Sequence, residues 1–142
     1  MELIRNCVAV DILAKENGRL DVSITAKSTW SGSFAISDGV AVPTRKDPSQ
    51  FVYKVSSALP RVINRYLPFS GVYQVLQTDY TNYAVIYSCT NFELVHSDLI
   101  WIWGRRQEIN AKTRADIYSS LQEYSLDSER LILPKDDNCT DY

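Results

Sequence analysis

The segment QTDYTNYAVIYSC, residues 77–89, shows how this chain is organised. A polar turn, TDYTN, is followed by YAVIY, in which apolar side chains occupy alternate and adjacent positions alike. Successive side chains of a strand point to opposite faces, so both faces of this strand are apolar, whereas a half-buried strand has one polar face. We therefore expect two different apolar partners for the strand, one on each face.

The composition is that of a folded domain that is not specialised for nucleic acid. The chain has 142 residues, of which 45% are apolar and 23% charged, with a net charge of −2. This length predicts a single domain, residues 1–142. No apolar run approaches the about 18 residues that a membrane-spanning helix needs. Without a basic patch, we expect small molecules or proteins as partners and no nucleic acid.

Turn signals divide the chain into seven strands. The Asn17-Gly18 pair is a strong hairpin signal and predicts that the strands on either side of it are antiparallel neighbours. Short links join the others, which favours an all-β, antiparallel up-and-down meander closed into a barrel or folded as a sandwich. The expected strands are 6–15, 20–28, 33–42, 50–57, 71–78, 83–89 and 93–103.

The pattern then changes to that of one helix, at about 110–124. Ile117, Leu121 and Tyr124 are spaced i, i+4 and i+7, and Asn110 is suited to the N-cap. The helix needs an apolar surface, and the two-faced strands supply one. We expect it to cover one face of these strands, outside the barrel, while the other lines the interior. A short last strand is expected at about 130–134.

These motifs resemble those of the lipocalin family. The resemblance rests on Thr78, Asp79 and Tyr80, on the YAV and YSC that follow, and on WIWGRR, in which Arg105 ends a long strand. It is strongest to the branch that includes apolipoprotein D, Lazarillo and the bilin-binding proteins. It implies an up-and-down barrel and a structural role for the four residues Thr78, Asp79, Tyr80 and Arg105, Arg105 at the closed end and Asp79 capping the turn.

The resemblance departs from the family at the N-terminus. Lipocalins begin with a Gly-x-Trp strand, and no such motif precedes residue 6. We expect a barrel whose first strand is missing from this chain, together with any signal peptide, in a protein that is secreted. The resemblance also implies a disulfide between Cys7 and Cys139. Cys89 is then left unpaired, because its counterpart would lie upstream.

The barrel interior is the expected binding site for a small hydrophobic ligand. The resemblance assigns six residues to it, and alternation adds Phe34 with Ile36 and Phe51 with Tyr53, although either face of those two strands could be the inner one. Aromatic walls favour a retinoid, a bilin, a steroid or a fatty acid. No cofactor or metal is required. The expected ligand-binding residues are Phe34, Phe51, Tyr53, Tyr73, Val75, Ala84, Ile86, Leu99 and Trp101.

The loop at 58–71, ALPRVINRYLPFSG, is long and apolar. It is expected to act as a lid, to contact a membrane or lipoprotein, or to pack against the barrel rim. Exposed strand edges would also allow a homodimer.

Two other function classes compete with a carrier. A few lipocalins are isomerases with an inward thiol, which would make Cys89 a nucleophile, and the third class is a protein-interaction or structural barrel. Cys89 lies outside the alternation of Ala84 and Ile86, and His96 is expected to pack or hydrogen-bond. The sequence shows no metal-ligand spacing and no phosphate-binding loop. We therefore expect a binding protein and no enzyme.

Overall fold

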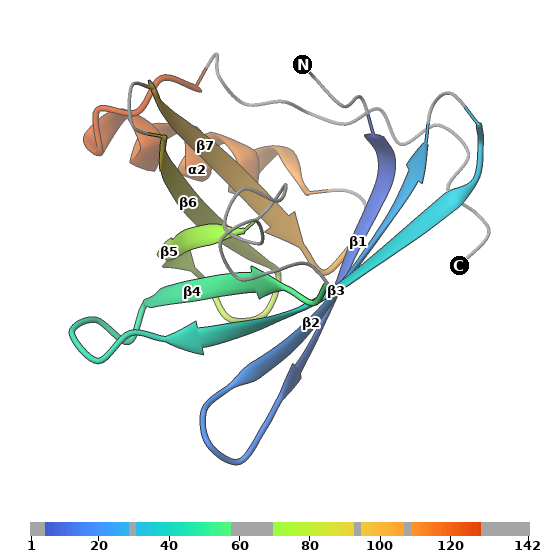
Figure 1. Ribbon diagram of the computed structural model, residues 1–142. Helices are drawn as coiled ribbons and strands as arrows, with labels where there is room; N and C mark the ends of the chain where they lie inside the picture. Colours follow the sequence, from blue (N-terminus) through green and yellow to red (C-terminus); the bar gives the residue numbers. More distant parts are fainter. Residues whose placement is uncertain (1–4, 29–30, 58–69, 93–94, 107–108, 129–142) are drawn as a thin grey trace. The chain divides into compact units, whose positions relative to one another are not determined.

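The computed structural model describes residues 5–28, 31–57, 70–92, 95–106 and 109–128 (Figure 1). The chain divides into two compact units, which are described separately. Unit 1 comprises Met1–Gly71 and Leu133–Tyr142, and unit 2 comprises Val72–Ile132. None of the described helices is long and apolar enough to cross a membrane.

Unit 1 contains a four-stranded antiparallel meander in which each strand pairs with the next along the chain. All four strands were predicted, with ends that differ from the observed ones by at most two residues. The shortest is the fourth, since Pro and Ser-rich segments flank it. Its strands are β1 (Arg5–Ala14), β2 (Leu20–Ser28), β3 (Phe34–Pro43) and β4 (Gln50–Val55).

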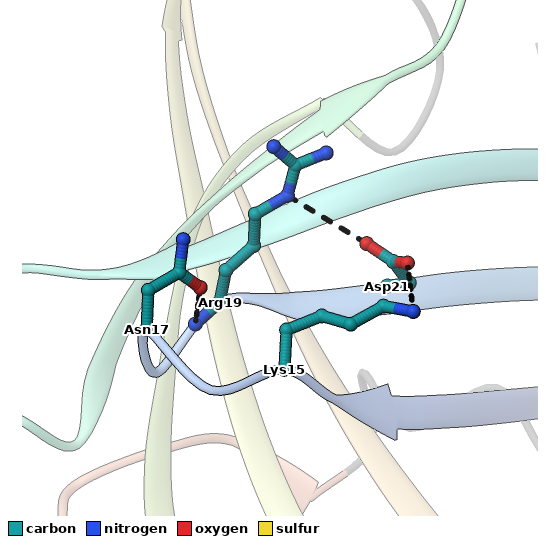
Figure 2. Close-up of polar contacts among 4 residues, drawn as sticks. All are labelled: Lys15, Asn17, Arg19 and Asp21. Atoms are coloured by element: carbon teal, nitrogen blue, oxygen red, sulfur yellow. Dashed lines mark hydrogen bonds and ion pairs between the residues drawn. The ribbon is translucent and has the colours of Figure 1, made fainter.

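The β1–β2 hairpin closes at the predicted Asn17-Gly18 turn (Figure 2). Gly18 has φ 75°, a left-handed conformation that glycine adopts without a steric penalty. The Asn17 side chain accepts a 3.1 Å hydrogen bond from the backbone N–H of Arg19. The Asp21 carboxylate forms ion pairs with Lys15 Nζ at 3.2 Å and with Arg19 Nε at 3.6 Å. These exposed ion pairs favour the turn only weakly, and the backbone geometry determines the register.

One face of the unit 1 sheet is the more buried of the two, although Ile12, which pairs with Val22, is 48% exposed. We call it the Val22 face. Alternation on β2 buries Val22, Ile24 and Ala26, while the residues between them are half-buried. On the neighbouring strands, Ala41 and Tyr53 are directly paired and lie on this face.

Unit 2 contains three further antiparallel strands and the helix. Gly71 begins β5 at the boundary between the units. A register shift between Val75 and Gln77 leaves Leu76 as the extra residue of a bulge. The elements are β5 (Gly71–Thr78), β6 (Tyr83–Phe92), β7 (Val95–Gly104) and α2 (Ala111–Glu123).

The helix α2 confirms the prediction and packs against one face of β6 and β7 (Figure 1). The Asn110 side chain is the N-cap, as predicted, and accepts a 2.8 Å hydrogen bond from the backbone N–H of Thr113. Ile117 and Leu121 are each 1% exposed and form a cluster with Val85. Tyr124 is 52% exposed, contrary to the predicted stripe, because it is the C-cap and lies past the last helical turn.

Some predicted features lie outside the described residues. These are the last strand at 130–134, Cys139 and all but the final two residues of the apolar loop 58–71. They stay predictions.

Candidate functional site

The strand register of unit 2 collects the predicted ligand-binding residues on one face, which we call the Ile86 face. Ile86 pairs with Trp101 on β7 and with Val75 on β5. Because directly paired residues point to the same side of a sheet, alternation along each strand places the others there too. The six predicted residues on this face are Tyr73, Val75, Ala84, Ile86, Leu99 and Trp101.

The opposite side of the same strands is the helix face. Val85, paired with Ile102, is 2% exposed and packs against Ile117 and Leu121 of α2. The two-faced strand was expected to have one apolar partner on each face. On the helix face that partner is α2, so this half of the expectation is confirmed. The Ile86 face points away from α2.

Exposure varies across the Ile86 face. Ile86 is 5% exposed, Leu99 is 43% exposed, and the other four predicted residues are intermediate. The register adds two residues that the sequence reasoning missed. Ser88 pairs with Leu99 and is 4% exposed, and Trp103 pairs with Ala84. Extending the alternation of Ala84 and Ile86 by one step would have found Ser88.

In unit 1, Phe51 and Tyr53 lie on the Val22 face, because Tyr53 pairs with Ala41 and Phe51 with Pro43. Tyr53 is 5% exposed. Burial, and to a smaller extent the negative charge of Asp38, raises the pKa of its hydroxyl above the ordinary value. Tyr53 therefore stays neutral at physiological pH.

Phe34 and Ile36 lie on the other face of this sheet. Phe34 pairs with Lys27 and Ile36 with Thr25, whereas the neighbouring Ala35 pairs with the buried Ala26. Phe34 is 38% and Ile36 69% exposed, and the Lys27 ammonium lies 5.6 Å from the Phe34 ring centroid. Phe34 and Ile36 therefore do not share a face with Phe51 and Tyr53, because seven positions, an odd number, separate Phe34 from Ala41, which pairs with Tyr53. Contact of Phe34 with a ligand stays a prediction.

The four motif residues Thr78, Asp79, Tyr80 and Arg105 meet at the β5–β6 turn. Asp79 Oδ1 accepts backbone hydrogen bonds from residues 81, 82 and 83 at 3.1, 2.7 and 3.0 Å. These bonds, above all those from Asn82 and Tyr83, hold the pKa of the carboxyl well below its usual range. An Arg105 guanidinium N–H donates to the Tyr80 carbonyl oxygen at 3.3 Å. Together these contacts order the turn.

Cys89 lies on the helix face, opposite Asp98 and two residues beyond Tyr87. Its side chain hydrogen-bonds with Tyr87, and the pKa of the Tyr87 hydroxyl is raised mainly by partial burial and then by the charge of Asp98. A cavity of about 280 Å³ adjoins this group and is lined by Tyr87, Asp98, Ile100, Ser125, Leu126 and Asp127. Cys89 is thus on the other side of the sheet from Ile86 and Trp101.

The part of the chain that the structure describes contains no group of three or more His, Cys, Asp or Glu side chains placed to hold a metal ion. Cys7 is 2% exposed and lies at a register irregularity of β1, with φ 55°. Its pairing with Cys139 stays a prediction, since Cys139 is outside the described residues.

Comparison with known proteins decides the family. The model of the lipocalin / cytosolic fatty-acid binding protein family matches residues 7–137. The chain belongs to the lipocalin family. Apolipoprotein D from Cavia porcellus is 32% identical over 139 residues, which cover 96% of this chain and 68% of that protein. Apolipoprotein D from Bos taurus is 29% identical over 136 residues, covering 94% and 67%. The sequence resemblance is confirmed.

Solved lipocalin structures share the fold. Apocrustacyanin C2 superposes with a TM-score of 0.75 at 19% identity, over 96% of this chain and 70% of that one. Insecticyanin from the tobacco hornworm Manduca sexta gives 0.74 at 18% identity, over 96% and 71%. At these identities the comparison is evidence for the fold alone. It confirms the antiparallel up-and-down lipocalin fold with its C-terminal helix. Members of the family are generally binding proteins for small hydrophobic molecules.

Proposed function

We propose that this lipocalin binds and carries a small hydrophobic ligand, of the retinoid, bilin, steroid or fatty-acid class. The observation that carries the proposal is the Ile86 face of unit 2. An apolar sheet face that points away from α2 and combines aromatic side chains with aliphatic ones is the kind of surface that apolar ligands bind. Such a ligand needs no enzyme chemistry and no cofactor.

Trp101 is the proposed central contact of this face. It is paired with Ile86, and its partly buried indole offers a large flat surface at low cost in conformational entropy. Tyr73, Val75, Ala84 and Leu99 surround this pair on the same face. In unit 1, Phe51 and Tyr53 are proposed as further ligand contacts on the Val22 face.

The test is calorimetric titration of the purified chain with all-trans-retinol, biliverdin and palmitic acid. We expect saturable binding of at least one of them with one-to-one stoichiometry and no chemical change of the ligand. Trp101→Leu is expected to weaken that binding about tenfold, because burying an aromatic side chain against a ligand is worth roughly 1.5 kcal/mol or more.

The matched control is Ile102→Val, one residue along β7 and on the helix face. It should leave the affinity unchanged while lowering stability slightly. Equal effects of the two variants on affinity would mean that the Ile86 face is not the binding surface. Failure of the folded chain to bind any of the three ligands would contradict the carrier function.

The finer features of the family pattern are part of the proposal. We propose that the protein acts outside the cell and that Cys7 pairs with Cys139. Contact of the loop 58–71 with a membrane or lipoprotein and formation of a homodimer stay predictions.

A further inference from the structure

The helix face of β6 and β7 becomes more open with distance from Val85. Val85 is 2% exposed where it packs against Ile117 and Leu121, whereas Tyr87, the next residue of β6 on this face, is only partly buried. Tyr87 pairs with Ile100 on β7. A cavity of about 280 Å³ lies there, and we call it the Tyr87 cavity. Its lining residues all belong to unit 2 and are Tyr87, Asp98, Ile100, Ser125, Leu126 and Asp127.

One wall of the Tyr87 cavity is fixed by the way α2 ends. The backbone N–H of Leu126 donates to the Leu121 carbonyl oxygen at 2.9 Å, and that of Ser125 donates to the Gln122 carbonyl oxygen at 3.0 Å. These two hydrogen bonds form a Schellman motif. The apolar contact that accompanies the motif is also present, because Leu126 packs against the cluster that contains Leu121. The wall is therefore held in a defined position.

Ser125 occupies the place in this motif that glycine usually takes. Its φ is 56°, a left-handed conformation that a Cβ atom makes sterically unfavourable. Glycine would end the helix at lower cost, so the helix end does not explain the serine. Ser125 lines the Tyr87 cavity, and its hydroxyl oxygen is an acceptor for a hydrogen bond from a bound group.

The electrostatic character of the Tyr87 cavity is negative. Asp98 and Asp127 each bring a carboxylate to the lining, and the described lining residues include no basic side chain. The C-terminal end of a helix adds partial negative charge, and the last turn of α2 has no basic residue to offset it. Partial burial and then the charge of Asp98 raise the pKa of the Tyr87 hydroxyl, so the Asp98 carboxylate lies near that group. The cavity therefore favours a cation.

The rest of the lining is apolar, and it decides which kind of cation fits. Ile100 and Leu126 reach the lining from the apolar cluster around Val85. The Tyr87 ring adds an aromatic surface, on which an ammonium group can bind by a cation–π contact. A bare metal ion would leave this apolar wall without a partner. An organic amine satisfies both parts of the lining, since its body covers the wall and its ammonium group donates three hydrogen bonds.

We propose that the Tyr87 cavity is a binding site for a small organic amine with an aromatic or aliphatic body. The ammonium group donates to the Asp98 carboxylate and to the Ser125 hydroxyl oxygen. Asp127, which is exposed, adds a second negative charge at the rim. This site lies on the helix face, opposite the Ile86 face, so it is separate from the proposed carrier site and does not depend on it.

The experiment uses tyramine, which joins a phenol ring to a primary amine, and follows the amide resonances of the isotope-labelled chain by NMR. We expect saturable one-to-one binding with a Kd of about 10 μM to 1 mM, as suits a ligand of about ten non-hydrogen atoms. The shifted resonances should include those of Tyr87, Asp98 and Ser125. Para-ethylphenol has the same ring without the ammonium group and should bind at least about tenfold more weakly. Equal affinities, or no tyramine binding up to about 10 mM, overturn the proposal.

Asp98→Asn removes the charge proposed to hold the ammonium group and keeps the size of the side chain. Tyramine binding should weaken about tenfold, because a hydrogen bond between charged groups is lost. The matched control is Asp116→Asn, since Asp116 is exposed on α2 and does not line the cavity. It should change the affinity by less than about twofold at physiological salt. Equal losses in the two variants would mean that tyramine responds only to the net charge, and the site would be overturned.

Ser125→Gly tests the same site at little risk to the fold, because glycine is the residue that this helix end favours. The variant lacks the hydroxyl and should bind tyramine about threefold more weakly, while its thermal stability stays the same or rises. Undiminished tyramine binding would overturn the placement of the ammonium group. Retinol binding separates this proposal from the carrier function. A chain that binds retinol but not tyramine retains the carrier function and lacks the amine site.

Discussion

The two faces of the β6–β7 pair have nearly the same apolar character but different partners. Val85 on the helix face and Ile86 on the other face are adjacent in sequence, and they are 2% and 5% exposed. Val85 packs against Ile117 and Leu121, whereas Ile86 points away from α2 and is paired with Trp101. The helix face is thus a structural core, and the Ile86 face is the candidate binding surface. Burial alone does not distinguish such roles.

The strongest way to test this difference is to remove packing from the helix face. Leu121→Ala should lower the free energy of unfolding by about 2–5 kcal/mol, because the side chain is 1% exposed and α2 cannot close the cavity fully. Denaturant unfolding measures the loss. Ligand affinity, measured well below the unfolding midpoint, should stay within about threefold, unlike that of Trp101→Leu.

Ser119→Ala on the exposed side of the same helix is the control for Leu121→Ala. Its hydroxyl is exposed and donates to the Ala115 carbonyl oxygen one turn earlier, so stability should be nearly unchanged. A Leu121→Ala variant as stable as Ser119→Ala would show that α2 is not held by this core.

A smaller effect is expected from loosening the start of the helix without touching its core. Asn110→Ala removes the side-chain acceptor for the Thr113 N–H and should cost about 1 kcal/mol of unfolding free energy. Asn110→Asp keeps an acceptor and should stay close to the original stability. Thermal unfolding of both variants provides the measurement, and an equal loss in the two would contradict the capping role.

The smallest effect is expected at the Asp79 turn, which belongs to neither face. Because hydrogen bonds lower the pKa of Asp79, its ionised form is favoured in the folded state. The resulting stability is complete above the ordinary pKa of 3.8 and is lost as the pH falls toward the lower folded-state value. The midpoint difference between the original chain and Asp79→Asn should therefore shrink on acidification below 3.8.

That difference is followed by thermal unfolding across a pH series. A difference that stays constant through the acidic range would mean that the Asp79 charge does not contribute. The hydrogen bonds to residues 81–83 would then act through geometry alone.

Much of this protein is determined by local patterns in its sequence. Alternation and turn residues predicted the seven strands and the hairpin at Gly18, and the i, i+4 spacing of Ile117 and Leu121 predicted the helix and its N-cap. These signals are local because backbone hydrogen bonding and side-chain direction repeat every two residues in a strand and about every 3.6 in a helix. The lipocalin motifs around Asp79 and Arg105 identified the family in the same way.

Only the tertiary structure decided which face of each strand is buried. Alternation shows that side chains change face at every residue but not which face is which. It could not show that Phe34 and Tyr53 lie on different faces of the sheet, because that depends on the register with β2 and β4. Nor could it show that the Tyr53 ring lies across the backbone of Gly39. That contact joins two strands and depends on how they pair, which alternation within one strand does not determine. Register and cross-strand packing are non-local, and they determine what the local patterns leave open.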